Sequence, residues 1–528
     1  VRTVYGHLTR FARGLGAGDR ISQGDIIGYV GMTGLATGPH LHYEYLSRGV
    51  HMDPQKVALP TDMPVPPAQM ARFREAAAPL LASLATGDVS ALVAARAPAV
   101  KPDPATAATP GALPPVVYLT GGPGQTWTDS VPTVQAGQSP GFVGGAKLPR
   151  DEVVLEQRGS IATTPALSCP AVSWGPEMFR NTAAALLAAL PGMKSCADGL
   201  IAKGVQPRHF TTDDMAADLE DLRQQLGYGK VVLNGVSFGT MWALAVARNH
   251  GAGVDAMVLD SVVSPAVRPV LTSGAALDQA FSAVAAACAA QPACAAAYPN
   301  LDNRVSALLD GLNAQPLPWA RGPAGEFNAT VAAGVLSSVT LFAPESLPRA
   351  VAAIEGLVAG GLSSLPSAQQ DDLVFLARSG LDSSINPAPG QAWSVVCADN
   401  ATTTQAELAA AAQAVRPAMR PALAAWYEAY HSICQGWPFR KDLPASIYQP
   451  LNSPVKTLIL SGALDPSTPP SWAQQVAGTL SNRTLVSFPA RAHSIQTASP
   501  CAQTLVNAFL AGQPLDTSCA AAETLSFE

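Results

Sequence analysis

A strand, a tight turn and a helix follow one another without a break in residues 230–250, and this succession restricts the fold more than any other feature. Residues 230–233 are largely apolar, as in a buried strand. The sequence Gly235-Val236-Ser237-Phe238-Gly239 then supplies the small residues that a sharp turn needs, and a helix is predicted over 238–250. A serine on such a turn is lifted above the end of its strand, with a helix amino terminus directly behind it.

The alternation of strands and helices continues on both sides of this turn. Further strands are predicted at 115–119, 152–156, 254–259, 455–460 and 484–488, and an amphipathic helix at 213–226. Such alternation indicates a mostly parallel sheet covered by helices, so we expect an α/β fold. Residues 266–440 interrupt it with an Ala-rich, mainly helical stretch, which we interpret as a cap inserted into the sheet.

These patterns divide the chain into five segments. They are a small mostly-β fragment at 1–58, a helix and Pro/Ala-rich linker at 59–112, the α/β core at 113–265 and 441–528, and the helical cap at 266–440 between the two core parts. Within the second segment, apolar residues at steps of three and four predict the helix at 66–84.

Charge and composition argue against several partners. The chain has 32 Lys and Arg against 38 Asp and Glu, a formal net charge of −6, and no long basic run, so we expect no nucleic-acid partner. No apolar stretch approaches about 20 residues without Pro, Gly or a charge, so no membrane span is expected. The first residue is Val and no signal segment follows it, from which we expect a processed chain or a fragment.

Eight cysteines form an even set, which is typical of a secreted or periplasmic protein stabilised by disulfides. About a hundred pairings are possible, and the sequential pairing closes short loops. The alternative is a set of reduced cysteines buried as small apolar residues. The positions are 169, 196, 288, 294, 397, 434, 501 and 519.

Ser237 needs a base and an acid, because a serine hydroxyl is a poor nucleophile by itself. Asp465 and His493 each follow a predicted strand, and no other histidine lies beyond that aspartate. Active sites of open α/β sheets gather at the carboxyl ends of the strands, where these side chains would meet. Backbone N–H groups of Phe238 and of the glycine turn around Gly122 are the expected oxyanion donors.

Five motifs together resemble the tripeptidyl aminopeptidase branch of the α/β-hydrolase peptidases, relatives of the proline iminopeptidases. They are GGPG at 121–124, QRG at 157–159, GxSFGT at 235–240, SGxxDPSTP at 461–469 and AxxHS at 490–494. The resemblance covers about 113–528 and implies an α/β-hydrolase fold with a helical cap, export, sequential disulfides and no cofactor.

By the same resemblance, Ser237 is the nucleophile, Asp465 the orienting acid and His493 the base. Gly122 and Phe238 are then the oxyanion donors. Two departures stand out. Glu156 occupies a position where the family usually has Asp, and the pair of strands with which the family begins has no evident match before GGPG. We therefore expect the hydrolase to lack its first edge strands.

An aminopeptidase must bind a free α-amino group, which calls for a carboxylate in a partly desolvated pocket. Asp399, two residues after Cys397, is the first choice. The rival carboxylates are Glu345, Glu355, Asp371 and Asp372. Arg158 of the QRG turn is interpreted as half of a structural ion pair rather than as a catalytic group.

Histidines gather between glycines in residues 1–58. His40 and His42 share one face of a predicted strand, an arrangement that suits zinc. With His7 in Tyr-Gly-His, they resemble the carboxyl end of a lysostaphin-like zinc endopeptidase of peptidoglycan. That resemblance implies His42 as a zinc ligand and His7 and His40 as groups that act on water and the oxyanion. Because the family's HxxxD ligands have no match here, we expect neither tight zinc binding nor peptidoglycan cleavage.

The sequence thus predicts an exported serine exopeptidase, of tripeptidyl or prolyl type, that acts on peptide amino termini. The alternatives are a zinc-dependent peptidoglycan endopeptidase joined to an inactive hydrolase, and a non-catalytic cell-wall-binding module. An esterase with the same residues stays open, because fold and triad do not determine the acyl substrate. Peptides are the expected partners, with peptidoglycan as a second one.

Overall fold

The structure is a computed structural model, and its chain divides into two compact units that are described separately. It describes residues 2–6, 8–11, 27–30, 42–47, 50–52, 94–97, 113–126, 150–169, 182–319, 325–361 and 388–527. The first unit holds a three-stranded antiparallel sheet, β1-β4-β5, and the antiparallel pair β2-β3. The bounds of its strands are Arg2–Gly6 (β1), Leu8–Phe11 (β2), Gly28–Val30 (β3), His42–Ser47 (β4) and Val50–Met52 (β5).

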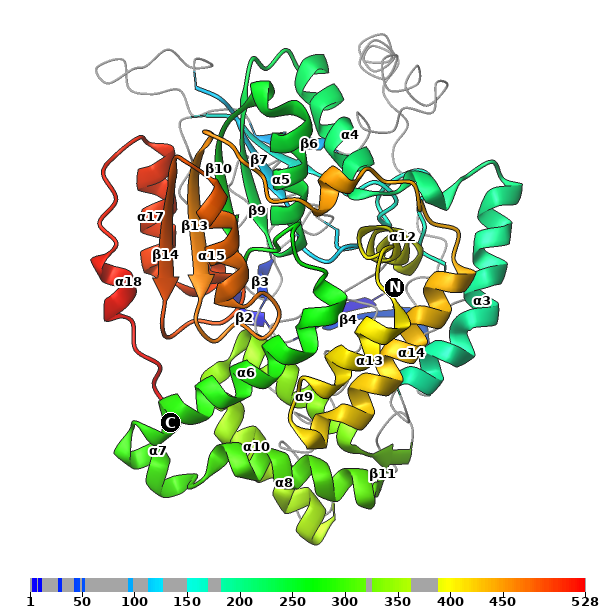
Figure 1. The fold of residues 1–528 in the computed structure, drawn as a ribbon, viewed down its shortest axis with the longest axis vertical. Coiled ribbons are helices and arrows are strands. Elements are labelled where there is room, and N and C mark those ends of the chain that lie inside the picture. Colours follow the sequence, from blue (N-terminus) through cyan, green and yellow to red (C-terminus); the bar gives the residue numbers. More distant parts are fainter. Residues whose placement is uncertain are drawn as a thin grey trace. The chain divides into compact units, whose positions relative to one another are not determined.

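A seven-stranded sheet in the order β14-β13-β10-β9-β7-β8-β6 forms the centre of the second unit (Figure 1). Six strands run parallel and β6 pairs antiparallel with β8 at one edge, so the predicted α/β-hydrolase fold is confirmed. The bounds are Ala94–Ala97 (β6), Val116–Leu119 (β7), Glu152–Leu155 (β8), Val231–Val236 (β9), Val254–Asp260 (β10), Lys456–Gly462 (β13) and Arg483–Phe488 (β14).

Strand β6 corrects the expectation that residues 59–112 contain only a helix and a linker, and it supplies one of the pair of edge strands that the hydrolase was expected to lack. Ala94 lies opposite Leu155 and Ala97 opposite Glu152, so β6 covers the edge of β8. The sequence Ala-Ala-Arg-Ala contains none of the β-branched or aromatic residues by which strands are usually predicted, which is why it was missed. The helix expected at 66–84 lies outside the described residues.

Side chains that alternate along the strands build a core on each face of the sheet. Val117 belongs to one buried cluster and its neighbour Val116 to the other, because successive strand residues point to opposite faces. The first cluster also contains buried side chains of α4, α5 and α15, and the second contains those of α17. The bounds of these helices are Thr212–Gln225 (α4), Phe238–His250 (α5), Pro470–Thr479 (α15) and Pro500–Leu510 (α17).

Between β10 and β13 the chain is mainly helical, and the arrows of β13 and β14 in Figure 1 point toward this region. The cap helices are Pro269–Ala289 (α6), Pro292–Ala297 (α7), Leu301–Ala314 (α8), Ala329–Phe342 (α9), Leu347–Gly360 (α10), Pro389–Asp399 (α12), Gln405–Gln413 (α13) and Arg420–Gly436 (α14). A short hairpin of Leu317–Trp319 (β11) and Gly325–Phe327 (β12) interrupts them. The remaining α-helices of the described residues are Thr182–Ala202 (α3), which packs on α14, Ile495–Ala498 (α16) and Ser518–Ala522 (α18).

Helix α6 is the one described helix with the length and composition of a membrane span. Its Phe281 and Val284 are fully buried, and the helix packs on α8 and α13 within the cap. Long apolar helices of a protein core share this composition with membrane spans.

Four disulfides join the eight cysteines in sequential order, as the family resemblance implied. The pairs are Cys169–Cys196, Cys288–Cys294, Cys397–Cys434 and Cys501–Cys519. The pair Cys397–Cys434 ties the end of α12 to α14, two helices that border the cavity described below.

Removing Cys397–Cys434 is expected to destabilise the protein more than removing Cys288–Cys294. The partners are 37 residues apart in the first pair and 6 in the second, so the first restricts the unfolded chain more. Chain entropy predicts losses of about 3–4 and about 2 kcal/mol in the free energy of unfolding. Urea unfolding of the two Cys→Ala double variants measures both losses, and the reverse order would contradict this explanation.

Candidate active site

Ser237 occupies the turn between β9 and α5, as its sequence context predicted. Its backbone has φ 56° and ψ −126°, a strained conformation for a residue with a side chain. A Cβ on Gly239 would lie 2.1 Å from the carbonyl oxygen of Leu119, and one on Gly235 would lie 2.4 Å from the carbonyl oxygen of Gly239. Both glycines are therefore required sterically, because β7 and the first turn of α5 leave no room for a side chain.

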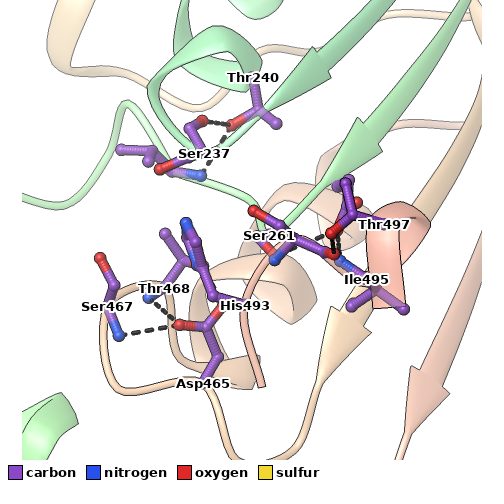
Figure 2. A network of polar contacts seen from close by, with 12 residues as sticks. Ser237, Thr240, Ser261, Asp465, Ser467, Thr468, His493, Ile495 and Thr497 are labelled. Atoms are coloured by element: carbon purple, nitrogen blue, oxygen red, sulfur yellow. Dashed lines mark hydrogen bonds and ion pairs between the residues drawn. The ribbon is translucent and has the colours of Figure 1, made fainter. Parts of the chain in front are cut away.

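Asp465 and His493 meet beside this turn. Figure 2 shows the imidazole standing between the Asp465 carboxylate and Ser237. His493 Nδ1 lies 2.8 Å from Asp465 Oδ2, and Asp465 is 2% exposed. Two strand ends bring the pair together, since Asp465 follows β13 and His493 follows β14. The structure thus collects at one rim of the sheet the three side chains that the sequence analysis selected.

The acid and the base shift each other's protonation. Burial alone would raise the pKa of Asp465, but the His493 ring and hydrogen bonds from Thr468 outweigh it, so that pKa is lowered. Burial alone would lower the pKa of His493, but the charge of Asp465 and the hydrogen bond to it outweigh burial, so that pKa is raised. The pair therefore favours an ionised carboxylate beside a ring of increased basicity.

Two backbone N–H donors belong to residues that line the same cavity as Ser237. Phe238 N is the first amide of α5, and a Cβ built on Gly121 would lie 3.6 Å from Ser237 Oγ, so the glycine turn runs alongside the hydroxyl. Gly122 has φ 104°, a conformation that favours glycine. Among the described residues, neither Gly122 N nor Phe238 N donates to another protein group. Both predicted oxyanion donors thus border the same space as Ser237.

A cavity of about 350 Å³ opens from Ser237. Its wall is mainly apolar and aromatic, with contributions from Trp393, Trp426 and Trp472. Asp399, at the end of α12, also lines it and accepts a hydrogen bond from Thr212 Oγ1 at 2.8 Å. Burial raises the pKa of Asp399 to about 7. The carboxylate selected from the sequence therefore shares a desolvated cavity with the nucleophile candidate.

The rival carboxylates lie elsewhere or outside the described residues. Glu355 is paired with Arg304, at 2.9 Å between Oε1 and Nε, and Glu345 does not line the cavity. Asp371 and Asp372 lie outside the described residues. Arg158 forms the expected ion pair, with its Nε 2.7 Å from Asp218 Oδ2.

The zinc-related histidines are only partly within the described residues. His42 is the first residue of β4, whereas His7 and His40 lie outside them. In the described part of the chain, no group of three or more His, Cys, Asp or Glu side chains is arranged to hold a metal. The expectation that this segment binds no zinc tightly stays a prediction.

Sequence reasoning did not select the residues that hold the acid and the base. Thr468 donates to Asp465 Oδ2 from its hydroxyl at 2.6 Å, and the N–H groups of Ser467 and Thr468 donate to Oδ1 at 2.8 Å (Figure 2). Asp260, at the end of β10, accepts the N–H groups of Ile495 and Gln496 and so fixes the chain just after His493. The Ser-Thr pair after Asp465 was an available signal, because aspartate side chains commonly accept amides two and three residues on.

Family models match three parts of the chain. Residues 114–296 match the alpha/beta hydrolase fold family, residues 420–519 match the TAP-like protein family, and residues 1–54 match peptidase family M23. Residues 420–519 are called the TAP-like segment and residues 1–54 the M23 segment below, after the families that they match.

Curated relatives match short stretches of the chain. Peptidoglycan DD-endopeptidase ShyC of Vibrio cholerae is 52% identical over 58 residues, which is 11% of this chain and 13% of that protein. DD-carboxypeptidase/endopeptidase Mpg of Neisseria meningitidis is 48% identical over 61 residues, 12% of this chain and 14% of that protein. The chain thus spans about one seventh of the length of these relatives.

Solved structures match a large share of the chain at low identity. An α/β hydrolase, MGS-M2, from a deep-sea metagenome has a TM-score of 0.33 at 12% identity, covering 80% of this chain and 94% of that chain. A proline iminopeptidase of Mycobacterium smegmatis has a TM-score of 0.32 at 14% identity, covering 79% and 94%.

Proposed function

We propose that the α/β-hydrolase domain of this chain, with its TAP-like segment, is a serine exopeptidase that acts at peptide amino termini. The proximity of Ser237, His493 and Asp465 at one rim of the sheet carries the proposal. Ser237 attacks the scissile carbonyl while His493 takes its proton and later donates it to the leaving amine. Asp465 holds the ring in the tautomer that accepts this proton.

The tetrahedral intermediate carries a negative oxygen that needs fixed donors. Gly122 N and Phe238 N supply them in this mechanism, and the amino terminus of α5 adds favourable partial charge. Collapse of the intermediate breaks the C–N bond and leaves an ester on Ser237. A water molecule, deprotonated by His493, then hydrolyses the ester and restores the serine.

The cavity supports action at a free amino terminus. An ionised Asp399 would bind the substrate ammonium in a partly desolvated site, where a charge pair is stronger than in water. The tryptophan-lined wall of the cavity suits apolar amino-terminal side chains. Blocking the α-amino group would remove the charge that Asp399 binds.

Export is part of this proposal. Disulfides form and persist in oxidising compartments, and the chain has four. One of the curated relatives is named as a peptidoglycan DD-endopeptidase, which supports a location at the cell wall, secreted or periplasmic.

Paired peptide libraries with free and acetylated amino termini test the activity. Release of amino-terminal fragments from the free peptides alone, sensitive to a fluorophosphonate and insensitive to chelator, is the expected result. Cleavage of peptidoglycan that is lost only with chelator would favour the M23 segment as the active part. Hydrolysis of simple esters with no peptide cleavage would favour an esterase.

Asp399→Asn is expected to remove the preference for free amino termini. Losing one partner of a buried charge pair costs enough to lower kcat/KM on free peptides by at least about 30-fold. Because the pKa of Asp399 is about 7, the wild-type KM for free peptides should rise as the pH falls below that value. A KM for an ester lacking the amine should not follow this pH dependence.

Glu355→Gln is the matched control, since Glu355 is a cap carboxylate that is paired with Arg304 and does not line the cavity. It should leave the ratio of free to acetylated cleavage unchanged. An unchanged ratio in Asp399→Asn as well would exclude Asp399 as the amine site and leave the serine mechanism intact.

A further inference from the structure

Gln157, in the turn after β8, is fully buried beneath the glycine turn that borders Ser237. Its Nε2 donates to the carbonyl oxygens of Gly121 at 2.6 Å and Thr120 at 3.3 Å. Its Oε1 accepts from Gly124 N at 2.9 Å. One side-chain amide therefore holds the turn from both sides, and the mechanism above assigns it no role.

The contact to Gly121 decides where Gly122 N–H points. The carbonyl of Gly121 and the N–H of Gly122 belong to the same trans peptide unit, in which the two bonds point in opposite directions. When the Gly121 carbonyl oxygen points toward Gln157, the Gly122 N–H therefore points away from Gln157. Ser237 and the cavity border this turn, and that N–H has no other acceptor among the described residues.

We propose that Gln157 is a positioning residue of the oxyanion site. It holds the Gly121–Gly122 peptide in the orientation that aims Gly122 N–H at the developing oxyanion, so it acts on the transition state more than on substrate binding. The inference rests on the proposed serine mechanism and adds to it a specific residue.

A second contact links this residue to the helix that ends in Asp399. Gln391 Nε2, on α12, donates to Gln157 Oε1 at 3.2 Å, and both side chains are fully buried. Gln391 Oε1 has no hydrogen-bond partner in the part of the chain that the structure describes. Gln391 Nε2 also lies 3.9 Å from Met215 Sδ, and its bond to Gln157 connects α12 with the side chain that holds the glycine turn.

Gln157→Met tests the proposal, because it keeps most of the side-chain volume and removes the donor. We expect kcat to fall about 10- to 100-fold with KM changed by no more than about twofold. A peptide aldehyde with a free amino terminus gives a second readout. Ser237 Oγ adds to its carbonyl carbon, the C=O π bond becomes an oxyanion, and the serine proton passes to His493. The affinity for this aldehyde should fall as much as kcat/KM, whereas the affinity for the peptide product should not change.

Thr163→Val is the matched control. Thr163 is buried in the same turn and accepts from Gly159 N at 3.0 Å, and the hydrogen bonds that its hydroxyl donates go to Ser160 O and Pro165 O. It should lower thermal stability while leaving kcat and aldehyde affinity within about twofold. Gln157→Glu is the second variant. It keeps the shape of the side chain and an oxygen that accepts from Gly124 N, but it replaces the Nε2 donor with a second oxygen. It should also lower the affinity for the aldehyde.

The possible results distinguish the role of Gln157 from the serine mechanism on which it rests. Wild-type aldehyde affinity in folded Gln157 variants, with Ser237 still labelled by fluorophosphonate, would overturn the role of Gln157 and leave the serine mechanism standing. Failure of both variants to fold would also count against it, because the role would then be structural. A wild-type protein that is not labelled at Ser237 would remove the serine mechanism itself.

Discussion

Ser237→Ala is expected to lower kcat/KM on peptides by at least about 10⁴-fold while the protein stays folded. The hydroxyl is the only group in this mechanism that forms a bond to the substrate, and the strained turn exists to expose it. Alanine fits that backbone as well as serine does, so thermal unfolding should change little. Steady-state kinetics on a free peptide, beside a melting curve, measures both.

Ser264→Ala serves as the control for this variant. Ser264 is a buried serine just after β10, and its hydroxyl donates to Gln475 Oε1 at 2.6 Å. Its loss should reduce activity by less than about tenfold, since it touches neither the acid nor the base. A Ser237→Ala protein that retains more than about a thousandth of the wild-type rate would count against Ser237 as the nucleophile.

Asp465→Asn is the second change with a very large effect, a fall of about 10⁴-fold in kcat. The carboxylate accepts from His493 Nδ1, which leaves Nε2 free to take the serine proton. An amide in its place can donate to Nδ1 and stabilise the wrong tautomer. It also removes the negative charge that raises the pKa of His493.

The pH profile distinguishes this effect from simple misfolding. His493 must be neutral to act as a base, and its pKa is raised, so wild-type activity should be lost as the pH falls through a midpoint above the ordinary imidazole value of about 6.5. In Asp465→Asn the residual activity should show a lower midpoint. An ester substrate without an amino group keeps the titration of Asp399 out of this measurement.

Thr468→Val is the companion variant. Thr468 donates to Asp465 Oδ2 at 2.6 Å, so losing it should cost about tenfold while the charge stays in place. If the midpoint of the pH profile of Asp465→Asn equals that of the wild-type protein, the pairing of Asp465 with His493 is contradicted.

The elbow could be predicted because its determinants are local. Gly235 is required by contacts within the strand–turn–helix unit itself, whereas Gly239 is required by the close approach of Leu119 and Thr120. Asp465 and His493 followed from the chain order of the family resemblance and from the position of both residues after apolar strands. The sequential disulfides came from the same resemblance.

The supporting residues could not be predicted, because their roles depend on contacts across the sheet. Gln157 belongs to a motif, but only the structure brings it under the Gly121 carbonyl. In the sequence, Asp260 is one acid at the end of an apolar strand. Ile495 and Gln496, whose N–H groups it accepts, lie more than 200 residues away in the chain. Strand β6 has the sequence Ala-Ala-Arg-Ala, without the β-branched or aromatic residues that usually indicate a strand.

Mapping the site of a fluorophosphonate on the full chain tests the central claim most directly. Peptide mass spectrometry of the labelled protein should find one phosphonyl group on Ser237, formed at a rate that drops when His493 is protonated. A label on any other residue, or a protein that cleaves peptides without being labelled, would contradict the claim that Ser237, His493 and Asp465 act together.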